Sequence, residues 1–250
     1  MTERRGYVVL GTPRSGTSHL CSLLAGTGVL GRPREYLNPD RLHLVTGEMA
    51  AAPGNLWESI CLTSLTSNRV WALKTFHEQL VDSDVWRHVV SSNIVFVSRN
   101  DKLGQAISLA RARQTDQWDA TTPPRAAPFY DASKIDQALY DILLQEATLR
   151  QMLAQAGTNV LWLIYEDFCL RPDGALSAIA AFVGVTERLN EQRAILSIQR
   201  DQLSEDWRQR YLEDRANFAD FPLFEPGDRW SRLGRRLRKA KRSLPLVRKW

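Results

Sequence analysis

Near its N-terminus the chain reads Tyr7-Val8-Val9-Leu10-Gly11-Thr12-Pro13-Arg14-Ser15-Gly16-Thr17-Ser18-His19-Leu20. The apolar start of this stretch predicts a buried strand, the polar loop ends that strand, and the spacing of Leu20, Leu23 and Leu24 predicts a helix over 17–27. A strand, a glycine-containing loop and a helix in this order direct backbone N–H groups and a helix N-terminus at a phosphate.

The loop is similar to a Walker A motif but lacks the lysine of that motif. Gly11 and Gly16 have the expected spacing, yet Thr17 and Ser18 stand where Lys and Ser or Thr belong. In a nucleoside triphosphatase this lysine reaches the terminal phosphates and the hydroxyl binds magnesium. The cation here is Arg14, inside the loop. We therefore expect the loop to bind a phosphate but to be poorly suited to metal-dependent triphosphate chemistry.

Downstream, short apolar stretches alternate with stretches of helical periodicity. Further strands are predicted at 70–74, 93–98 and 160–164, and helices at 56–65, 78–90, 102–117, 135–156 and 172–183. In the longest helix, Leu139 and Leu143 belong to the side predicted to be apolar and buried. This alternation predicts an α/β fold, a P-loop-type parallel sheet with helices on both faces.

The composition limits the class of protein. With 250 residues, 44% of them hydrophobic, the chain can bury a sizeable core as one domain. Charged residues precede the first strand, so no signal peptide is expected, and no apolar run reaches the length of about 18 residues that a membrane span needs. The three cysteines lack disulfide or metal-ligand spacing, which fits a reducing cytoplasm.

The charge is unevenly distributed. Ten of the 33 Lys and Arg residues lie in 229–250, which contains no acidic residue, although the chain has 28 of these. We therefore expect an acidic domain over 1–228 and a basic C-terminal tail over 229–250. Leu and Trp alternate with the cations of the tail, which suits an anionic membrane surface at the cytoplasmic side of the inner membrane, although a solvated tail is equally compatible. Nothing beyond charge favours nucleic acid.

Two motifs together resemble a known family. The loop Thr-Pro-Arg-Ser-Gly-Thr-Ser over 12–18 is similar to the 5′-phosphosulfate loop of sulfotransferases that use 3′-phosphoadenylyl sulfate (PAPS). The segment Gly28-Val29-Leu30-Gly31-Arg32-Pro33-Arg34-Glu35-Tyr36-Leu37 resembles the region after that loop in the Stf0 family of bacterial carbohydrate sulfotransferases. The resemblance implies a sulfotransferase that moves a sulfuryl group from PAPS to a carbohydrate or glycolipid hydroxyl and releases adenosine 3′,5′-bisphosphate. Family members can dimerise.

The resemblance also implies roles in donor binding. The loop residues Pro13, Arg14, Ser15, Gly16, Thr17 and Ser18 would hold the 5′-phosphosulfate. Arg99, at the end of the strongest predicted strand, and Ser108, on the next helix, take the places of the Arg and Ser that bind the 3′-phosphate. A guanidinium and a hydroxyl form a sound anion clamp. On sequence alone Arg99 is also compatible with a surface ion pair to Asp101, and Ser108 with a solvated helix position.

Glu35 takes the place of the catalytic glutamate of the family, and sulfuryl transfer needs a base to remove the hydroxyl proton. A solvated or ion-paired Glu35 is the alternative. His77 is the competing base, because cytosolic sulfotransferases of animals use a histidine. Arg14 and Lys74 are expected to stabilise the charge on the departing phosphate, although Lys74 could instead extend to solvent. No metal-ligand spacing is evident, and no metal is expected.

Arg34, Gln114 and Trp118 are the predicted contacts of the acceptor. The stretch 111–118 resembles one that follows the 3′-phosphate helix in Stf0-like and rhizobial nodulation-factor sulfotransferases, and an indole can stack on a sugar ring. Two other functions remain open. One is a P-loop nucleotide kinase or NTPase, disfavoured by the missing Walker lysine and the lack of an evident magnesium-binding aspartate. The other is a membrane-surface module that binds anions without catalysis.

Overall fold

The computed structural model of the chain describes residues 5–39, 45, 56–81, 85–118, 123–189 and 201–216. Residues 1–208 form one unit, and residues 209–250 form a second, of which 209–216 are described. The basic tail predicted over 229–250 lies outside the described residues, so the domain boundary at 228 stays a prediction. No helix within the described ranges has the length and apolar character needed to cross a membrane.

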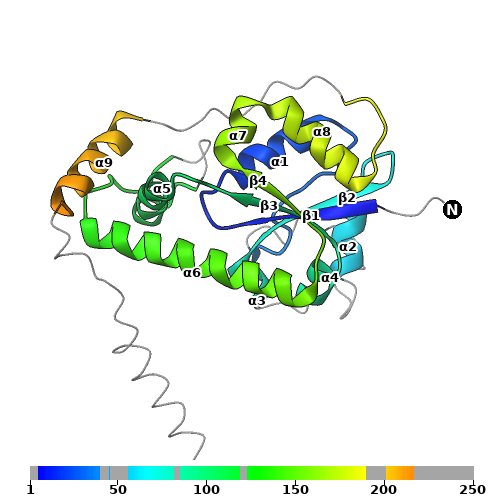
Figure 1. Ribbon diagram of the computed structural model, residues 1–250, viewed down its shortest axis with the longest axis horizontal. Coiled ribbons are helices and arrows are strands. Elements are labelled where there is room, and N and C mark those ends of the chain that lie inside the picture. The colour runs from blue at the N-terminus through cyan, green and yellow to red at the C-terminus, as the bar shows by residue number, and fades with distance from the viewer. Residues whose placement is uncertain are drawn as a thin grey trace, which may run out of the picture. The chain divides into compact units, whose positions relative to one another are not determined.

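Four parallel strands form the sheet, in the order β2-β1-β3-β4 (Figure 1). They are β1 (Arg5–Gly11), β2 (Val70–Phe76), β3 (Asn93–Ser98) and β4 (Val160–Ile164). The chain leaves β1 toward β2 on one side and leaves β3 toward β4 on the other, so the crevice beyond the carboxyl ends of β1 and β3 is the point where open α/β sheets bind ligands. The predicted parallel α/β sheet is confirmed.

Nine helices are found in the described parts of the chain. They are α1 (Thr17–Gly26), α2 (Leu56–Thr63), α3 (His77–Val81), α4 (Trp86–Val90), α5 (Lys102–Thr115), α6 (Ala132–Ala156), α7 (Tyr165–Leu170), α8 (Pro172–Val183) and α9 (Gln202–Asp214). Helix α8 has the predicted bounds, because Pro172 suits the first turn and Gly184 adopts the left-handed conformation that ends the helix.

Both faces of the sheet are covered. Tyr7 and Val9 of β1 point to one face, where they pack in a core with α1, α7 and α8. Val8 and Leu10 point to the other face and pack with α2, α4 and α6. Figure 1 shows α1, α7 and α8 on one side of the strands and α6 on the other. The strict alternation along β1 gives the sheet its two buried faces and fixes its register.

Two predictions about helices were wrong. The single helix predicted over 78–90 is two helices, α3 and α4, and the sequence between them contains Asp82, Ser83 and Asp84, residue types that favour helix caps over interiors. In α6, Leu143 is 49% exposed, because the buried side follows the spacing of Ile135, Ala138, Ile142, Glu146, Leu149 and Leu153. The carboxylate of Glu146 thus lies on the buried side of α6, and Leu143 does not.

Candidate active site

The loop after β1 has the backbone geometry of an anion-binding turn. Gly16 lies in the left-handed region with φ of 94°, and a Cβ there would lie 2.1 Å from the ring of Tyr165, so only glycine fits. Arg14 is also left-handed, with φ of 63°. The side chain of Ser15 is fully buried, and its Oγ has no hydrogen-bond partner among the described residues. A buried hydroxyl with spare hydrogen-bonding capacity beside a helix N-terminus suits an anionic ligand.

A buried glutamine on α5 forms hydrogen bonds to this loop. Gln105 is fully buried, and its Nε2 donates to Oγ1 of Thr12 and to the carbonyl of Pro13, each at 2.8 Å. These two bonds fix the first half of the loop to the helix that follows β3. Sequence reasoning missed Gln105, since a glutamine inside a helix carries no local signal of a long-range contact.

Arg14 connects the loop to two other predicted site residues. Its Nε donates to Oγ of Ser108 at 2.8 Å, and its Nη1 donates to the carbonyl of Trp118. Trp118 is 47% exposed, and its Nε1 donates to Asp116. The structure therefore brings together a predicted phosphosulfate residue, a predicted 3′-phosphate residue and a predicted acceptor residue.

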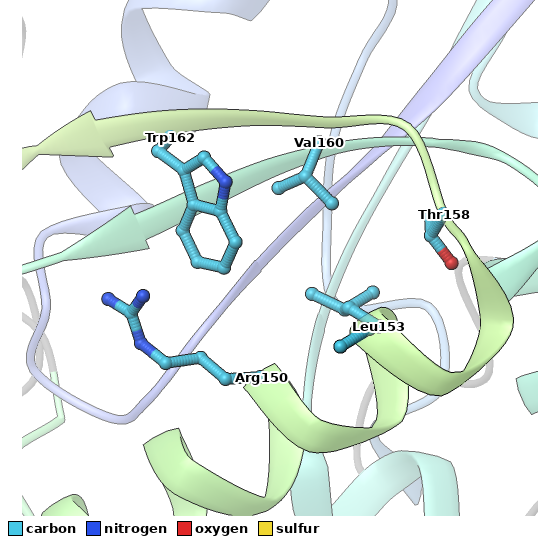
Figure 2. Close-up of a pocket in the computed structure, with 6 residues that line it drawn as sticks. Arg150, Leu153, Thr158, Val160 and Trp162 are labelled. Atoms are coloured by element: carbon cyan, nitrogen blue, oxygen red, sulfur yellow. The ribbon is translucent and has the colours of Figure 1, made fainter.

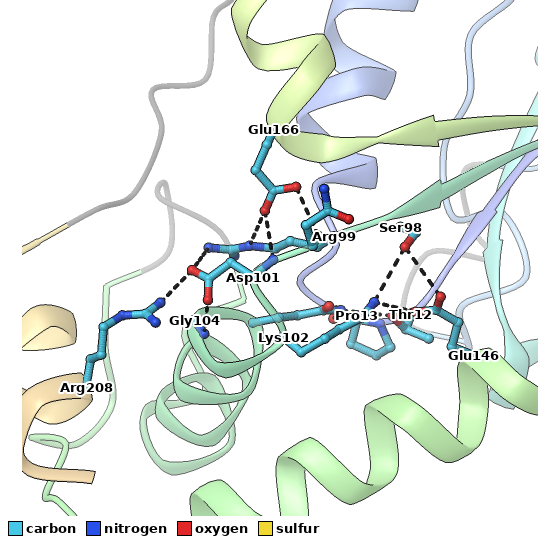
Figure 3. A network of polar contacts seen from close by, with 12 residues as sticks. Thr12, Pro13, Ser98, Arg99, Asp101, Lys102, Gly104, Glu146, Glu166 and Arg208 are labelled. Atoms are coloured by element: carbon cyan, nitrogen blue, oxygen red, sulfur yellow. Dashed lines mark hydrogen bonds and ion pairs between the residues drawn. The ribbon is translucent and has the colours of Figure 1, made fainter. Parts of the chain in front are cut away.

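Arg99 extends from the end of β3 into a polar network. Its guanidinium lies 5.0 Å from the centre of the Tyr165 ring. It also lies 3.5 Å from Asp101 and 3.7 Å from Glu166, and Figure 3 shows these two carboxylates beside it. The ion pair with Asp101 that the sequence left open is thus present. The side chain is 13% exposed, and its Nε has no hydrogen-bond partner within the described residues. Arg99 is held in place by its neighbours and keeps donor capacity.

A pocket of about 290 Å³ lies at this network. Arg99, Ser108 and Arg208 line it, together with Asp101, Gly104, Asp201, Ser204 and Glu205. Arg208, on α9, forms an ion pair with Asp101, as Figure 3 shows. Burial by itself would raise the pKa of Asp101, but the hydrogen bonds from Arg208 and from the Gly104 N–H outweigh burial and hold the pKa below its usual value. Arg208 was not among the predicted residues.

The predicted base and the predicted lysine form a buried pair. Nζ of Lys74 lies 2.6 Å from Oε1 of Glu35 and donates to Oγ of Ser18 at 2.8 Å. The Lys74 side chain is 5% exposed and that of Glu35 is 14% exposed. Lys74 therefore points inward, which excludes the solvent-exposed alternative. Gln79 and Asn38 donate to the other oxygen, Oε2, at 3.3 Å each. Neither amide was predicted from the sequence.

Three other predicted site residues are His77, Arg34 and Gln114. His77 begins α3 and is partly exposed, and its ring has no hydrogen bond or ion pair with any described residue. Arg34 has an exposed side chain, while its carbonyl accepts the N–H of Lys74 at 3.0 Å. Gln114 accepts the N–H of Phe129 at 2.9 Å, and its buried Nε2 has no partner in the described ranges.

A second pocket, of about 260 Å³, lies at the start of β4 and contains none of the predicted residues (Figure 2). Arg150, Leu153, Ala154, Thr158, Val160 and Trp162 line it. The guanidinium of Arg150 stacks 4.5 Å from the centre of a Trp162 ring. This pocket is removed from the carboxyl ends of the strands, so the candidate active site is the region around the 11–18 loop.

Comparison with known proteins identifies relatives with named activities. The chain is 25% identical over 253 residues to the trehalose 2-sulfotransferase of Mycolicibacterium smegmatis, covering 83% of this chain and 94% of that protein. It is 24% identical over 231 residues to nodulation protein H of Rhizobium tropici, covering 86% and 90%.

Solved structures give weaker likenesses. The sulfotransferase STF9 from Mycobacterium avium has a TM-score of 0.48 and 11% identity, covering 87% of this chain and 70% of that one. Mouse sulfotransferase SULT7A1, complexed with PAP, has a TM-score of 0.45 and 16% identity, covering 84% and 65%. The family model described as Stf0 sulphotransferase matches residues 6–86 and 63–214. That match spans most of the chain, which therefore belongs to the Stf0 sulphotransferase family.

Proposed function

We propose that this protein transfers the sulfuryl group of PAPS to a hydroxyl of a carbohydrate or glycolipid, with Glu35 as the general base. One observation carries the proposal. Lys74 joins the carboxylate of Glu35 to Ser18, in the first turn of the helix that follows the loop. A base and a donor-binding loop that share one buried lysine are suited to a reaction in which a proton leaves as a negative leaving group departs.

The residues present fit the donor. The buried hydroxyl of Ser15 and the N–H groups at the start of α1 would hold the 5′-phosphosulfate, together with Arg14. Arg99 and Ser108, which line one pocket, would hold the 3′-phosphate. The donor supplies an activated sulfuryl group whose leaving group, adenosine 3′,5′-bisphosphate, already carries negative charge, so the reaction needs no metal bridge.

In the proposed reaction each of these side chains has its own role. Glu35 accepts the proton of the acceptor hydroxyl as that oxygen bonds to sulfur and the bond from sulfur to the bridging phosphate oxygen breaks. Lys74 and Arg14 stabilise the charge that grows on the phosphate. His77 remains the alternative base, but its ring has no hydrogen bond or ion pair with a described residue, whereas Glu35 is held on both oxygens. We therefore favour Glu35.

The relatives and the surface near the loop support a carbohydrate as the acceptor. The relatives named trehalose 2-sulfotransferase indicate a carbohydrate. Trp118 is half-exposed, and its own carbonyl accepts a hydrogen bond from Arg14. Its indole would stack on a sugar ring, and Gln114 and Arg34 would bind the hydroxyl groups of the sugar. The basic residues of 229–250 would bring the enzyme to an anionic membrane surface on the cytoplasmic side, where a glycolipid acceptor is within reach.

Calorimetric titration tests the donor site. We expect adenosine 3′,5′-bisphosphate to bind without metal and more tightly than ATP or ADP. Arg99→Ala should weaken that binding by about 10- to 100-fold, because a charge-assisted contact is lost. An acceptor screen with PAPS follows, with Glu35→Gln as the control that binds the bisphosphate but does not turn over. Preference for ATP with magnesium would overturn the proposal in favour of nucleotide phosphoryl transfer.

A further inference from the structure

Gln79 makes contacts with two different parts of the site. It is the third residue of α3, which directly follows β2. Its Oε1 accepts the N–H of Phe76 at 3.3 Å and the hydroxyl of Thr75 at 3.1 Å. Its Nε2 donates to Oε2 of Glu35 at 3.3 Å. One amide thus connects the end of β2 to the proposed base.

The contact with Phe76 fixes which end of the Gln79 amide faces Glu35. The N–H of Phe76 can only donate, so the oxygen of the Gln79 amide must face it. The NH₂ group of the same amide then has to face Glu35. Phe76 directly precedes α3, and Gln79 lies three residues after it, a position where a glutamine often caps the start of a helix. Capping explains the contact to Phe76 but not the contact to Glu35.

The contact to Glu35 adds something that Lys74 does not supply. Lys74 holds Oε1, but the terminal torsion of a glutamate is broad, so one held oxygen leaves the plane of the carboxylate free to turn. Donors on Oε2 remove that freedom, and Gln79 is the donor whose own orientation is set by the sheet. Resting on the proposed function, we propose that Gln79 is a positioning residue that fixes the plane of the Glu35 carboxylate for proton removal from the acceptor.

Replacement of Gln79 by Glu separates positioning from capping. A glutamate caps the helix as well as a glutamine does, so the bond to Phe76 survives. The NH₂ donor, however, becomes a carboxylate that faces Glu35, and two carboxylates in contact resist joint ionisation. Gln145→Glu is the matched control, since Nε2 of the partly buried Gln145 donates at 3.0 Å to Oε1 of Glu78, an exposed residue that is also on α3.

The experiment measures kcat and KM between pH 5 and 9 with PAPS and an acceptor, affinity for adenosine 3′,5′-bisphosphate, and the ¹³C titration of the Glu35 carboxyl, assigned with Glu35→Gln. For Gln79→Glu we expect kcat to fall by about 10- to 100-fold, part of the roughly 10²–10⁴ that a positioned base supplies. The acidic limb of the kcat profile and the Glu35 titration should both move up by about one pH unit or more. Bisphosphate affinity should stay unchanged, and Gln145→Glu should match the native protein throughout.

The outcomes are distinguishable. A Gln79→Glu protein with native kcat, pH profile and Glu35 titration would reduce Gln79 to a helix cap and overturn the inference. Loss of bisphosphate affinity along with kcat would also overturn it, because that result signals collapse of the donor site. The native protein could transfer no sulfuryl group while Glu35 still titrates at a higher pH in Gln79→Glu than in the native protein. In that case the proposed function fails, but the contact through which Gln79 orients the Glu35 carboxylate stands.

Discussion

Nζ of Lys74 and Oε1 of Glu35 lie 2.6 Å apart, and both side chains are largely buried. The lysine comes from β2, and the glutamate comes from the segment that follows α1. The N–H of Lys74 also donates to the carbonyl of Arg34 at 3.0 Å, so the backbone beside Glu35 is tied to the strand as well. The pair therefore has a fixed geometry, as a base that acts on a bound acceptor needs.

Glu35→Gln tests the identity of the base. The amide keeps the shape of the side chain but cannot accept a proton, so we expect kcat to fall by at least about 100-fold. Affinity for adenosine 3′,5′-bisphosphate should be retained, because Glu35 is not proposed to touch the donor. In steady-state assays the matched variant His77→Gln should stay within about threefold of the native rate. The reverse pattern, with a loss only in His77→Gln, would move the base to His77.

Lys74→Met tests the pair itself. The change leaves the carboxylate of Glu35 without its buried cation, and removing one partner of such a pair costs about 3–5 kcal/mol. We expect urea unfolding to show a loss in that range and kcat to fall as well. The double variant Lys74→Met/Glu35→Gln should regain part of the stability, because no charge is left unpaired, but none of the activity. Additive losses in the double variant would contradict the coupling.

Sequence reasoning located the backbone of the site better than its side-chain contacts. The strand 93–98 and the helix 172–183 have the predicted bounds, because an apolar run and a Pro–Gly pair of helix ends are local signals. Helix α9 was missed, since its residues are mostly polar and give no clear apolar periodicity. Helix α7 was missed because it begins immediately after β4, with no turn residue between them.

The same division holds in the site. The 11–18 loop, Glu35 and Lys74 could be predicted because they fall in motifs or at the ends of apolar runs. The contacts of Gln105 with Thr12 and of Gln79 with Glu35 join residues 93 and 44 positions apart, and a glutamine has no pattern that reveals its partner. Such contacts follow from the order of the strands, which brings the segments after β1, β2 and β3 to one edge of the sheet.

Gln105→Leu tests the support of the loop. Leucine fills the same buried space but removes the donor to Thr12 and Pro13, so we expect the loop to lose its fixed shape. Unfolding free energy should fall by about 1–3 kcal/mol, because buried acceptors are left unpaired. Calorimetry should show roughly tenfold weaker binding of adenosine 3′,5′-bisphosphate. Thr12→Val, which removes one of the two bonds, should have a smaller effect, and equal effects would argue against the role of the Pro13 contact.

Asp101→Asn gives a pH-dependent test of the network around Arg99. The pKa of Asp101 in the folded protein is lowered, so its ionised form stabilises the fold above the unfolded pKa of about 4, and that stability is lost as pH falls through the folded pKa. Near pH 7 we expect the free energy of unfolding of Asp101→Asn to be about 1–3 kcal/mol lower than that of the native protein, since Arg208 loses a charged partner. Urea unfolding below pH 4 should show the difference shrinking.

Asp141→Asn, in an exposed pair with Arg113, is the control and should lower the free energy of unfolding by less than about 1 kcal/mol. A difference for Asp101→Asn that is the same at pH 7 and pH 3 would mean that the Asp101 charge does not stabilise the fold.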